Sequence, residues 1–380
     1  MFSYWEQQSF SAYDHIVIGA GIVGLSTAIE LKQRFPSARV LVLERGLLPT
    51  GASSRNAGFA CMGSLTELLD DLELMPEADM LALFSRRKRG LERLRSRLGD
   101  AAIGYQQDGS HELIGEAELP ALERIDYLNS LLQPITGKAA FRLANERIQT
   151  FGFSSRHVLA LVENSCEGSL NTGKMLRALT DTAIAAGVEI KTGARVTRME
   201  EHQSHMHITV EDGFRETSWT LHAHTVCVCT NAFAGELIQD ANVTPGRGQV
   251  LITQPIPDLK LKGVYHFDKG YYYFRELDGR VLIGGGRNMD FKAETTTRLE
   301  LNEQIQLALE QKLQEVIIPG VHFQVAQRWA GIMAFGSTKS PIVRAFSERL
   351  YGAFRMGGMG VALGSEVAMQ VADLVGERLS

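Results

Sequence analysis

Short apolar runs and stretches of helical periodicity alternate along most of this chain of 380 residues. The first apolar run, 15–18, leads into the sequence GAGIVG at 19–24, and the apolar positions that follow recur at helical spacing to about residue 35. A second apolar run, 39–43, ends at Glu44. This succession predicts a strand, a tight turn, a helix and a second, parallel strand, which together open a doubly wound α/β sheet.

A similar pattern returns later in the chain. Residues 77–98 predict a long helix, and we expect its arginine-rich side to face solvent. Helix and strand signals then alternate again, with a hairpin near 207–221 and a continuous apolar strand at 225–229. A glycine cluster at 357–364 opens a final helix that we expect to end near Leu374.

Residues 245–330 have a different pattern, with short strands separated by turns and then a helix near 299–316. This predicts an antiparallel sheet in a layer of its own. We therefore predict an α/β protein that combines a Rossmann-type nucleotide-binding domain with an α+β substrate domain built on an antiparallel sheet. The predicted nucleotide-binding domain is discontinuous and comprises 12–76, 150–244 and 328–380, and the predicted substrate domain comprises 77–149 and 245–327.

Composition and charge narrow the class of protein. Hydrophobic residues make up 44% of the chain, and 39 basic against 44 acidic side chains give a net charge of −5. This is ordinary globular composition, and an acidic chain lacks the basic field that nucleic-acid binding needs. The four cysteines form no CxxC pair, no apolar run reaches the roughly 18 residues of a membrane span, and the first residues do not resemble a signal peptide. We therefore expect a cytoplasmic protein with no membrane segment and no nucleic-acid partner.

The glycines at 19–24 lie where a dinucleotide-binding turn needs them. Gly19 permits the tight turn, Gly21 lets a pyrophosphate approach the backbone, and Gly24 lets helix and strand pack closely. The helix N-terminus offers free N–H groups to the phosphates, and Glu44 can accept hydrogen bonds from the adenosine ribose.

This fingerprint fits NAD or FAD, and three features favour FAD. The turn is near the N-terminus, a segment rich in small and polar residues follows at 50–59, and another glycine cluster comes more than 300 residues later at 357–364. No second GxGxxG occurs in the middle of the chain, so the sequence shows no separate nicotinamide domain. We expect a flavin dinucleotide held by both the early and the late glycine clusters.

Several segments together resemble the D-amino-acid oxidase-like family of FAD-dependent oxidoreductases, whose members include glycine oxidase, sarcosine oxidase and amino-acid dehydrogenases. The resembling segments are IVIGAGIVGLSTA, VLVLERG, GASSRNAGFA, CVCTNAF, YYYFRELDGRVLIGGG, QRWAGIMAFGSTKSPIV and FRMGGMGVALGS. They extend over nearly the whole chain in the order that the family shows. The resemblance implies an FAD-dependent oxidase or dehydrogenase of amino acids or amines.

The candidate FAD-binding residues combine the glycine turn with positions that the resemblance implies. It places the Val196 backbone at the adenine and 358–363 at the flavin. Some relatives attach FAD through a histidine where this chain has Arg55, and others through a cysteine after WAG that this chain lacks, so we expect non-covalent FAD. The full set is Gly19, Gly21, Ile22, Val23, Gly24, Glu44, Arg45, Ala52, Ser53, Ser54, Arg55, Asn56, Ala57, Gly58, Phe59, Val196, Gly331, Gly358, Met359, Gly360, Val361, Ala362 and Leu363.

The substrate side is predicted from the strand that begins at YYYFR. Tyr271, Tyr273 and Arg275 alternate along one strand face, and the resemblance places the position of Tyr271 beside the substrate. Met333 stands where many members of the family carry an arginine that clamps the substrate carboxylate, and methionine cannot do this. We take Tyr271, Tyr273, Arg275 and Met333 as the candidate catalytic residues.

The other carboxylate anchors of the family fall on Ala362 and Gly358, which carry no charge. Either another cation such as Arg275, Lys339 or Arg55 replaces the clamp, or the substrate is an amine, an N-alkylated compound or a larger molecule.

Five histidines lie close together around the predicted hairpin, at His202, His205, His207, His222 and His224. Their x-H-x-H spacing would let them meet across two strands as metal ligands. The expected flavin chemistry needs no metal, so we expect solvent-facing histidines and no metal site.

We expect hydride transfer from a C–H next to an amine nitrogen to flavin N5, giving an imine that hydrolyses in water. The partners would be a small-molecule amine or amino-acid substrate and O₂ or another electron acceptor, and the sequence leaves the oligomeric state open. One alternative is an FAD-dependent dehydrogenase of a 2-hydroxy acid or polyol, with His266 or His322 as the base. Another is a non-catalytic flavin-bearing or electron-relay subunit, which the missing carboxylate anchors would favour.

Overall fold

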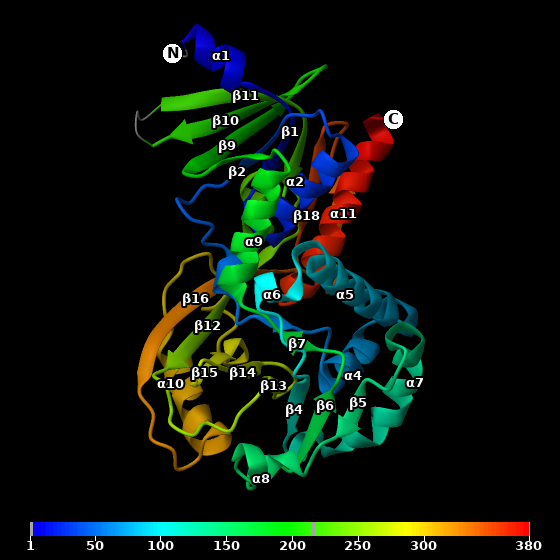
Figure 1. Cartoon of the computed structure of the whole chain (residues 1–380), viewed down its shortest axis with the longest axis vertical. Helices are drawn as coiled ribbons and strands as arrows, with labels where there is room; N and C mark the ends of the chain where they lie inside the picture. The colour runs from blue at the N-terminus through cyan, green and yellow to red at the C-terminus, as the bar shows by residue number, and fades with distance from the viewer. Residues whose placement is uncertain (1–2, 214–216, 380) are drawn as a thin grey trace.

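The chain folds into two units that are stacked along the long axis of the molecule (Figure 1). The structure is a computed structural model and describes residues 3–213 and 217–379. One unit is built on a sheet with a parallel centre, and the other on a largely antiparallel sheet. This architecture confirms the predicted α/β class, with a Rossmann-type unit and a second unit of α+β type.

The first sheet has eight strands around its parallel centre. β1 (Ala12–Ile18) pairs in parallel with β2 (Val40–Leu43) and β11 (Thr217–Val228), and β11 pairs in parallel with β18 (Leu350–Phe354). The registers align the carboxyl ends of these strands at one edge, and ligands of open α/β sheets bind beyond that edge. The remaining strands are β8 (Glu189–Lys191), β9 (Ala194–Glu201), β10 (Met206–Asp212) and β17 (Ile342–Ala345).

Two helices that are far apart in the sequence lie side by side on this sheet (Figure 1). α2 (Ile22–Arg34) follows the glycine turn, and α11 (Gly360–Leu379) packs against it. Leu25 and Val371 belong to the core that the two helices share. α11 continues past its predicted end near Leu374, because the next residue, Val375, is apolar and fully buried in the core.

The long helix α5 (Glu77–Leu98) has the predicted bounds, but the prediction that its arginines face solvent holds only in part, because Arg87 is buried while Arg89 is exposed. Arg89 and Arg93 form ion pairs with Glu366 of α11, and Arg97 forms one with Glu30 of α2. Both glutamates are buried. These carboxylates are far away in the sequence, so the local pattern of α5 does not reveal them.

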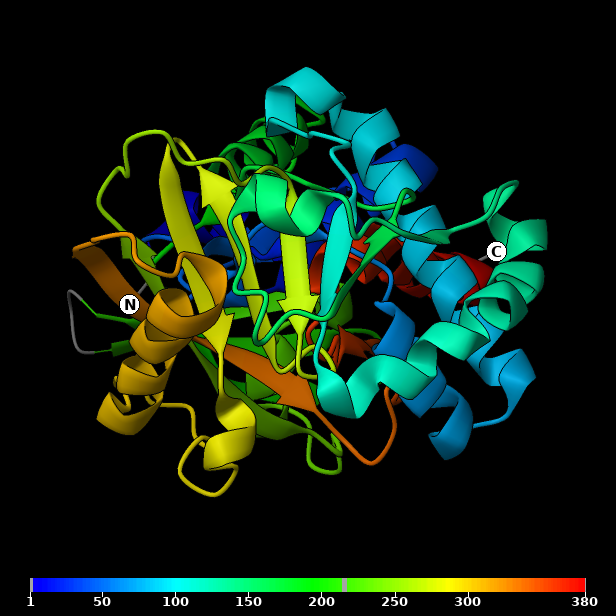
Figure 2. The ribbon, with the colours of Figure 1, turned by 90° about the horizontal axis from the view of Figure 1, so that it is seen from below.

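The second sheet runs in the order β16-β12-β15-β14-β13-β4-β6-β5 and is antiparallel except where β13 pairs with β4. Figure 2 shows it from below, with α10 on one side and α5 and α7 on the other. α10 (Glu303–Lys312) is shorter than the predicted helix and ends in a π-helical turn, Leu313–Ile317. The strands are β4 (Ser110–Ile114), β5 (Phe141–Leu143), β6 (Ala160–Asn164), β12 (Thr244–Thr253), β13 (Val264–Phe267), β14 (Tyr272–Leu277), β15 (Arg280–Gly285) and β16 (Val325–Phe335).

Two boundaries of the predicted domain division disagree with the pairing of the strands. The predicted nucleotide-binding domain includes β6 within 150–244, but β6 pairs with β4 and β5. β16 falls largely within 328–380, but it pairs along its length with β12 of the second sheet. Because a strand belongs to the sheet that satisfies its backbone, we propose boundaries near 166 and 336.

Short elements connect the two sheets and cover the ends of the second. A two-stranded ladder of β3 (Phe59–Ala60) and β7 (Gly168–Ser169) joins residues from separate parts of the chain.

No helix in the described ranges is both long and apolar enough to cross a bilayer. The other helices are α1 (Tyr4–Phe10), α3 (Ala52–Arg55), α4 (Leu65–Leu74), α6 (Asp100–Ile103), α7 (Ile125–Thr136), α8 (Arg147–Phe151) and α9 (Thr172–Ala185), with 3₁₀ turns at Glu116–Arg124, Asn231–Glu236 and Arg287–Met289.

Glu112 of β4 is a buried carboxyl group that we expect to make stability pH dependent. Burial raises its pKa to about 8, although hydrogen bonds from Thr66 and Ser64 act in the opposite direction. The folded pKa lies above the ordinary 4.5, so the stability that this group contributes is complete below pH 4.5 and is lost as the pH rises toward 8. Between pH 5 and pH 8.5, the free energy of unfolding, measured in urea, should fall in the wild type by more than about 1 kcal/mol beyond its fall in Glu112→Gln. Equal losses in the two proteins would contradict this assignment.

Candidate functional site

The turn after β1 requires glycine at three positions. Gly19 has a φ of +105°, and a Cβ at Gly24 would lie 1.8 Å from the carbonyl oxygen of Gly19. A Cβ at Gly21 would lie 2.8 Å from Oγ of Ser53. The close packing that the sequence predicts is therefore present, and the contact of this turn with a pyrophosphate stays a prediction.

Polar groups from three segments meet at the start of α2. The amide of Ile22 donates to Oγ of Ser53 at 2.9 Å, which holds the segment 50–59 against the helix N-terminus. Glu44, at the end of β2, is 9% exposed and accepts hydrogen bonds from the amides of Ala20 at 3.0 Å and Gly46 at 2.9 Å. The carboxylate and the helix N-terminus thus share one edge of the sheet.

Two further predicted FAD positions, Arg45 and Val196, lie near Glu44. The guanidinium carbon of Arg45 is 3.6 Å from the ring centroid of Phe233. The amide of Ala194 donates to the carbonyl of Glu44 at 2.9 Å, which brings the start of β9, with Val196, next to this residue. Both positions therefore lie near Glu44, as the predicted adenosine site requires.

The segment 50–59 is fixed to the second sheet as well. Nη1 of Arg55 donates to the carbonyl of Ala330 at 3.0 Å, and Nε1 of Trp329 donates to the carbonyl of Arg55 at 2.9 Å. A Cβ at Gly331 would lie 3.2 Å from Cβ of Arg55. The guanidinium of Arg55 is bonded to backbone, so it is a poor replacement for the missing carboxylate clamp.

The late glycine cluster lies beside the early one. A Cβ at Gly364 would lie 2.6 Å from Cγ2 of Ile22, so the starts of α11 and α2 are in contact. The amide of Gly357 donates to the carbonyl of Ala334 at 2.9 Å, which ties this turn to β16. The side chains at 361–363 are buried in the core, so contacts from these residues to a flavin would come from the backbone.

These features fit a long dinucleotide such as FAD. A Cβ at Gly51 or at Gly358 would meet no described atom within 4 Å, so both turns border open space. The N-termini of α2 and α11 lie at the same edge and offer N–H groups to anionic parts of a ligand.

On the substrate side, Tyr273 and Met333 converge on one face of the second sheet. Ring atoms of Tyr273 are 2.6 Å from the Cβ position of Gly284. Its hydroxyl is 3.9 Å, and Cε of Met333 is 3.0 Å, from the Cβ position of Gly248. Glycines therefore create the room that these two side chains occupy. Burial raises the pKa of Tyr273 to about 12, so its hydroxyl stays protonated.

Tyr271 lies just outside β14 and is 41% exposed. Its ring centroid is 6.1 Å from that of Phe291. It therefore lies at the margin of the face that carries Tyr273.

Arg275 shares the face of Tyr273, as its alternation predicts, but its guanidinium has other partners. Nη1 donates to the carbonyls of Ala57, Gly58 and Leu170, the last at 2.8 Å, and Nη2 donates to Oγ of Ser169 at 3.1 Å. Arg275 is 5% exposed. We propose that it positions the β3–β7 ladder and does not bind substrate.

The third cation considered as a clamp, Lys339, is paired as well. Its ammonium group forms an ion pair with Asp71 of α4, and that carboxylate is buried. Lys339 is thus neutralised by a carboxylate, and the guanidinium groups of Arg275 and Arg55 are tied to backbone carbonyls.

Arg287 is the cation that the sequence analysis missed. Its guanidinium carbon is 2.9 Å from the Cβ position of Gly246 and 4.2 Å from the ring centroid of Phe335. Nε of Arg287 is buried and has no hydrogen-bond partner among the described residues, and the structure gives this side chain no salt bridge within those ranges. The sequence offered one signal for Arg287, which is its position directly after the three glycines at 284–286.

Arg287 belongs to the same face as Tyr273 and Met333. Gly246 and Gly248 are two residues apart on β12, so their Cβ positions point to one face and lie roughly 6–7 Å apart. Arg287 lies over the first position, and Tyr273 and Met333 lie at the second. A substrate could thus contact all three side chains.

His266, a candidate base in the alternative function, is buried on β13 opposite Tyr273. Its ring centroid is 5.1 Å from that of Phe59, and its Nε2 has no hydrogen-bond partner among the described residues. His322, the other candidate, is exposed in the stretch before β16. The structure therefore places His266, and not His322, beside the candidate substrate face.

The structure also gathers histidines of the predicted hairpin. β10 and β11 pair as antiparallel strands, as predicted, and residues 214–216 at the tip lie outside the described residues. His205, His207 and His222 are close neighbours at the other end of the hairpin.

The family model for FAD dependent oxidoreductases matches residues 14–374. Among curated proteins, the chain is 26% identical over 279 residues to the bifunctional protein ThiO/ThiG of Trichormus variabilis, and 25% identical over 290 residues to that of a Nostoc species. Each match covers 71% of this chain and 39% of the relative, so the chain matches about two fifths of their length.

Solved structures share the fold over almost the whole chain. The L-proline dehydrogenase from P. horikoshii has a TM-score of 0.77 at 19% identity, covering 97% of this chain and 94% of that one. The glycine oxidase from Geobacillus kaustophilus has a TM-score of 0.77 at 22% identity, covering 97% and 95%. The iminodiacetate oxidase from Chelativorans sp. BNC1 has a TM-score of 0.73 at 20% identity, covering 96% and 95%.

Proposed function

Because this chain belongs to the FAD dependent oxidoreductase family, we propose that it oxidises the C–N bond of an amine that carries a carboxylate, such as an amino acid. The observation that supports this most is the guanidinium of Arg287, which has no salt bridge to a described residue and lies on the face that carries Tyr273 and Met333. The solved neighbours are named for enzymes of proline, glycine and iminodiacetate, and each of these compounds contains an amine and a carboxylate.

We propose that FAD is held non-covalently along the carboxyl edge of the first sheet. The turn at 19–24 and Ser53 would bind the phosphates, and Glu44 the ribose, because they meet at the N-terminus of α2. The backbone of 358–363 would hold the flavin end. When bound, FAD supplies the acceptor for the hydride that leaves the carbon next to the amine nitrogen.

The chain's own residues would bind and orient the substrate. Arg287 would hold the carboxylate through two parallel N–H···O bonds, which fix direction as well as position. Tyr273, protonated at neutral pH, would donate a hydrogen bond to the substrate. Met333 and Phe335 supply an apolar surface, which disfavours the ammonium form and leaves the lone pair of the amine nitrogen available.

One observation supports the alternative of a 2-hydroxy-acid dehydrogenase. His266 is buried beside the same face and has an Nε2 with no partner among the described residues, which suits a base for a hydroxyl proton. Arg287 would bind the carboxylate of an amino acid and of a 2-hydroxy acid alike. Only a comparison of substrates can therefore separate the two functions.

Anaerobic mixing of the FAD-loaded protein with amino acids, N-alkylated amino acids, simple amines and 2-hydroxy acids tests this function. We expect carboxylated amines to bleach the flavin absorbance near 450 nm at least about tenfold faster than the matched amines that lack a carboxylate. Bleaching by hydroxy acids alone would support the alternative. Bleaching by none of the panel would support a non-catalytic flavoprotein.

A further inference from the structure

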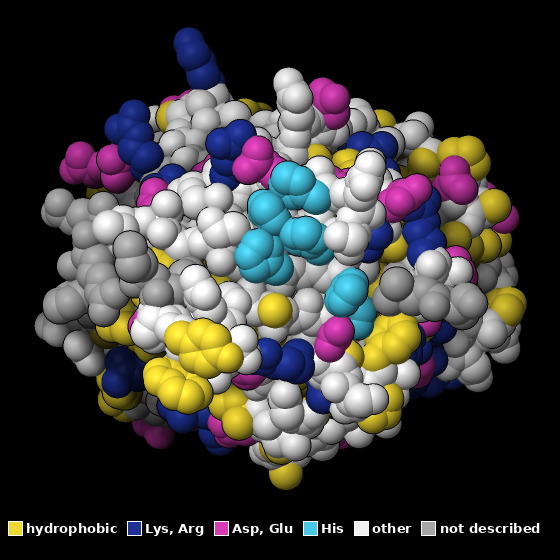
Figure 3. Space-filling model, turned by 90° about the horizontal axis from the view of Figure 1, so that it is seen from above, with side chains coloured by type: hydrophobic (Ala, Val, Ile, Leu, Met, Phe, Trp, Pro, Cys, Tyr) yellow, Lys and Arg dark blue, Asp and Glu magenta, His cyan; other side chains and the backbone are white. Residues whose placement is uncertain are grey.

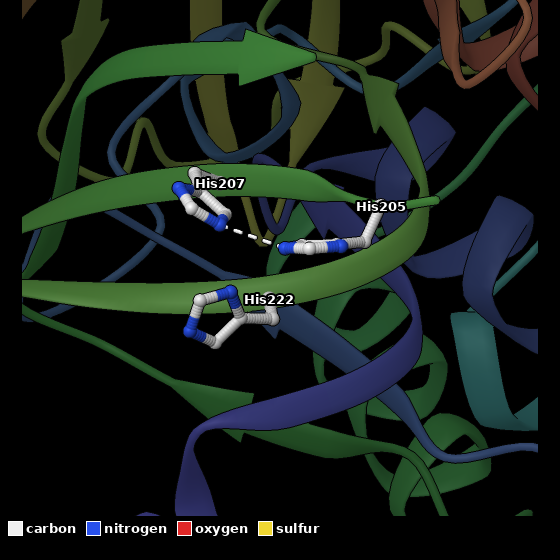
Figure 4. A group of neighbouring side chains, drawn as sticks. All are labelled: His205, His207 and His222. Atoms are coloured by element: carbon white, nitrogen blue, oxygen red, sulfur yellow. Dashed lines mark hydrogen bonds between the residues drawn. The ribbon is translucent and has the colours of Figure 1, made fainter. Parts of the chain in front are cut away.

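Histidines form a cluster where β10 pairs with β11 in the first sheet, and the proposed flavin reaction does not use them. His205 comes directly before β10, and His207 and His222 are direct partners across β10 and β11 (Figure 4). The register of the two strands therefore sets how these side chains meet. Figure 3 shows histidine side chains gathered on the surface at this end of the molecule.

The three side chains can present ring nitrogens to one point. One nitrogen from each of His205, His207 and His222 lies within 4.8 Å of the others. Nε2 of His205 and Nε2 of His207 are 2.7 Å apart, and the ring centroids of His207 and His222 are 4.6 Å apart. Nitrogens bound to one tetrahedral Zn²⁺ lie about 3.3 Å apart, because Zn–N is about 2.0–2.1 Å. Small side-chain rotations would therefore suffice.

The surroundings favour imidazoles that act as ligands. Nδ1 of His205 is 2.8 Å from Oγ of Ser204, and this bond fixes the direction of the ring. Nε2 of His205 now shares a hydrogen bond with Nε2 of His207, and a metal would replace that hydrogen bond with two metal–nitrogen bonds. Nδ1 of His222 is buried and has no hydrogen-bond partner among the described residues.

We propose that His205, His207 and His222 bind one transition-metal cation of the Zn²⁺ or Cu²⁺ type, with water completing the coordination. Three imidazole nitrogens suit these ions better than Mg²⁺ or Ca²⁺, which prefer oxygen. His202, whose ring centroid is 4.0 Å from that of His207, is near enough to serve as a fourth ligand.

The metal site is remote from the proposed FAD site. His222 pairs with Ala12 at the start of β1, whereas the glycine turn leaves β1 after Ile18. Six residue steps of a strand span roughly 20 Å. The metal would join the turn before β10 to β11 and leave the substrate face unchanged, so its role would be to stabilise this outer part of the sheet.

Calorimetric titration of Zn²⁺ into FAD-loaded protein without an affinity tag tests the proposal. We expect one Zn²⁺ per chain, and a loss of affinity of at least about tenfold in the double variant His205→Ala/His222→Ala. The flavin absorbance and the rate of substrate oxidation should be unchanged in this variant, because the cluster lies outside the proposed active site.

His322→Ala is the matched control, since it removes an exposed histidine from the other sheet unit. It should bind Zn²⁺ like the wild type. The proposal is overturned if the wild type binds well below one Zn²⁺ per chain, or if the double variant and the control bind with equal affinity. A circular dichroism spectrum that matches the wild type excludes unfolding as the cause of a lost Zn²⁺ affinity in a variant.

Discussion

Replacing Arg287 with methionine is expected to raise KM for a carboxylated amine about 100-fold, with a smaller change in kcat. Removing one partner of a buried, hydrogen-bonded charge pair costs about 2–5 kcal/mol, and 100-fold corresponds to about 2.7 kcal/mol. Steady-state kinetics with the best substrate of the panel measures the effect. Arg287→Lys should recover part of the loss, because lysine keeps the charge but loses the two-bond geometry.

Two controls make this result specific to a carboxylate contact. Arg298→Met removes an exposed arginine from the same unit and should leave KM unchanged, since its guanidinium pairs with Glu300 at the surface. An amine that lacks the carboxylate should be oxidised equally by the wild type and by Arg287→Met. A kcat/KM for the carboxylated amine within about threefold of the wild type would rule out the clamp.

Arg275→Met is expected to lower the free energy of unfolding by about 3–5 kcal/mol and to reduce the retention of FAD. The change leaves the buried carbonyls of Ala57 and Leu170 without this donor, while the carbonyl of Gly58 keeps the amide of Leu170. Each unpaired buried group costs about 1–3 kcal/mol. Urea unfolding and the ratio of flavin to protein absorbance measure the two effects.

Kinetics can separate this positioning role from a substrate contact. If Arg275 contacted the substrate, Arg275→Met would raise KM and leave the unfolding curve unchanged. If Arg275 positions the β3–β7 ladder, the variant loses FAD affinity and stability together. Arg280→Met, on the neighbouring strand β15, should have a much smaller effect, because the arginine there donates to Thr253 near the surface. Unfolding of Arg275→Met at the wild-type urea concentration would contradict the proposed role.

The elements that the sequence predicts well are those whose signal is local. The turn at 19–24 shows its glycine spacing, its flanking strand and its helix within a few residues, and the helix at 77–98 shows its own periodicity. Glu44 follows the same rule, because the end of an apolar run is visible without knowledge of any partner. The structure agrees with each of these predictions.

The features that the sequence could not show depend on partners from distant segments. The arginines of α5 look solvent-facing until Glu30 and Glu366 are placed next to them. Arg275 looks like a free cation until the carbonyls of the β3–β7 ladder surround it. Arg287 becomes a candidate only when β12 brings Gly246 beneath it. In each case the sequence gives the charge, and the tertiary fold decides whether that charge is already paired.

The strand order of the first sheet bears on how this protein matures during synthesis. The neighbour of β1, β11, follows it some two hundred residues later in the chain, and β18, on the far side of β11, comes later still. β1 can pair with β2 soon after both are made, but its other edge has no partner until β11 follows, and such long-range pairing slows folding and leaves a strand edge open to aggregation. Because we propose that both glycine clusters hold FAD, we expect cofactor uptake to wait until α11 has docked against α2.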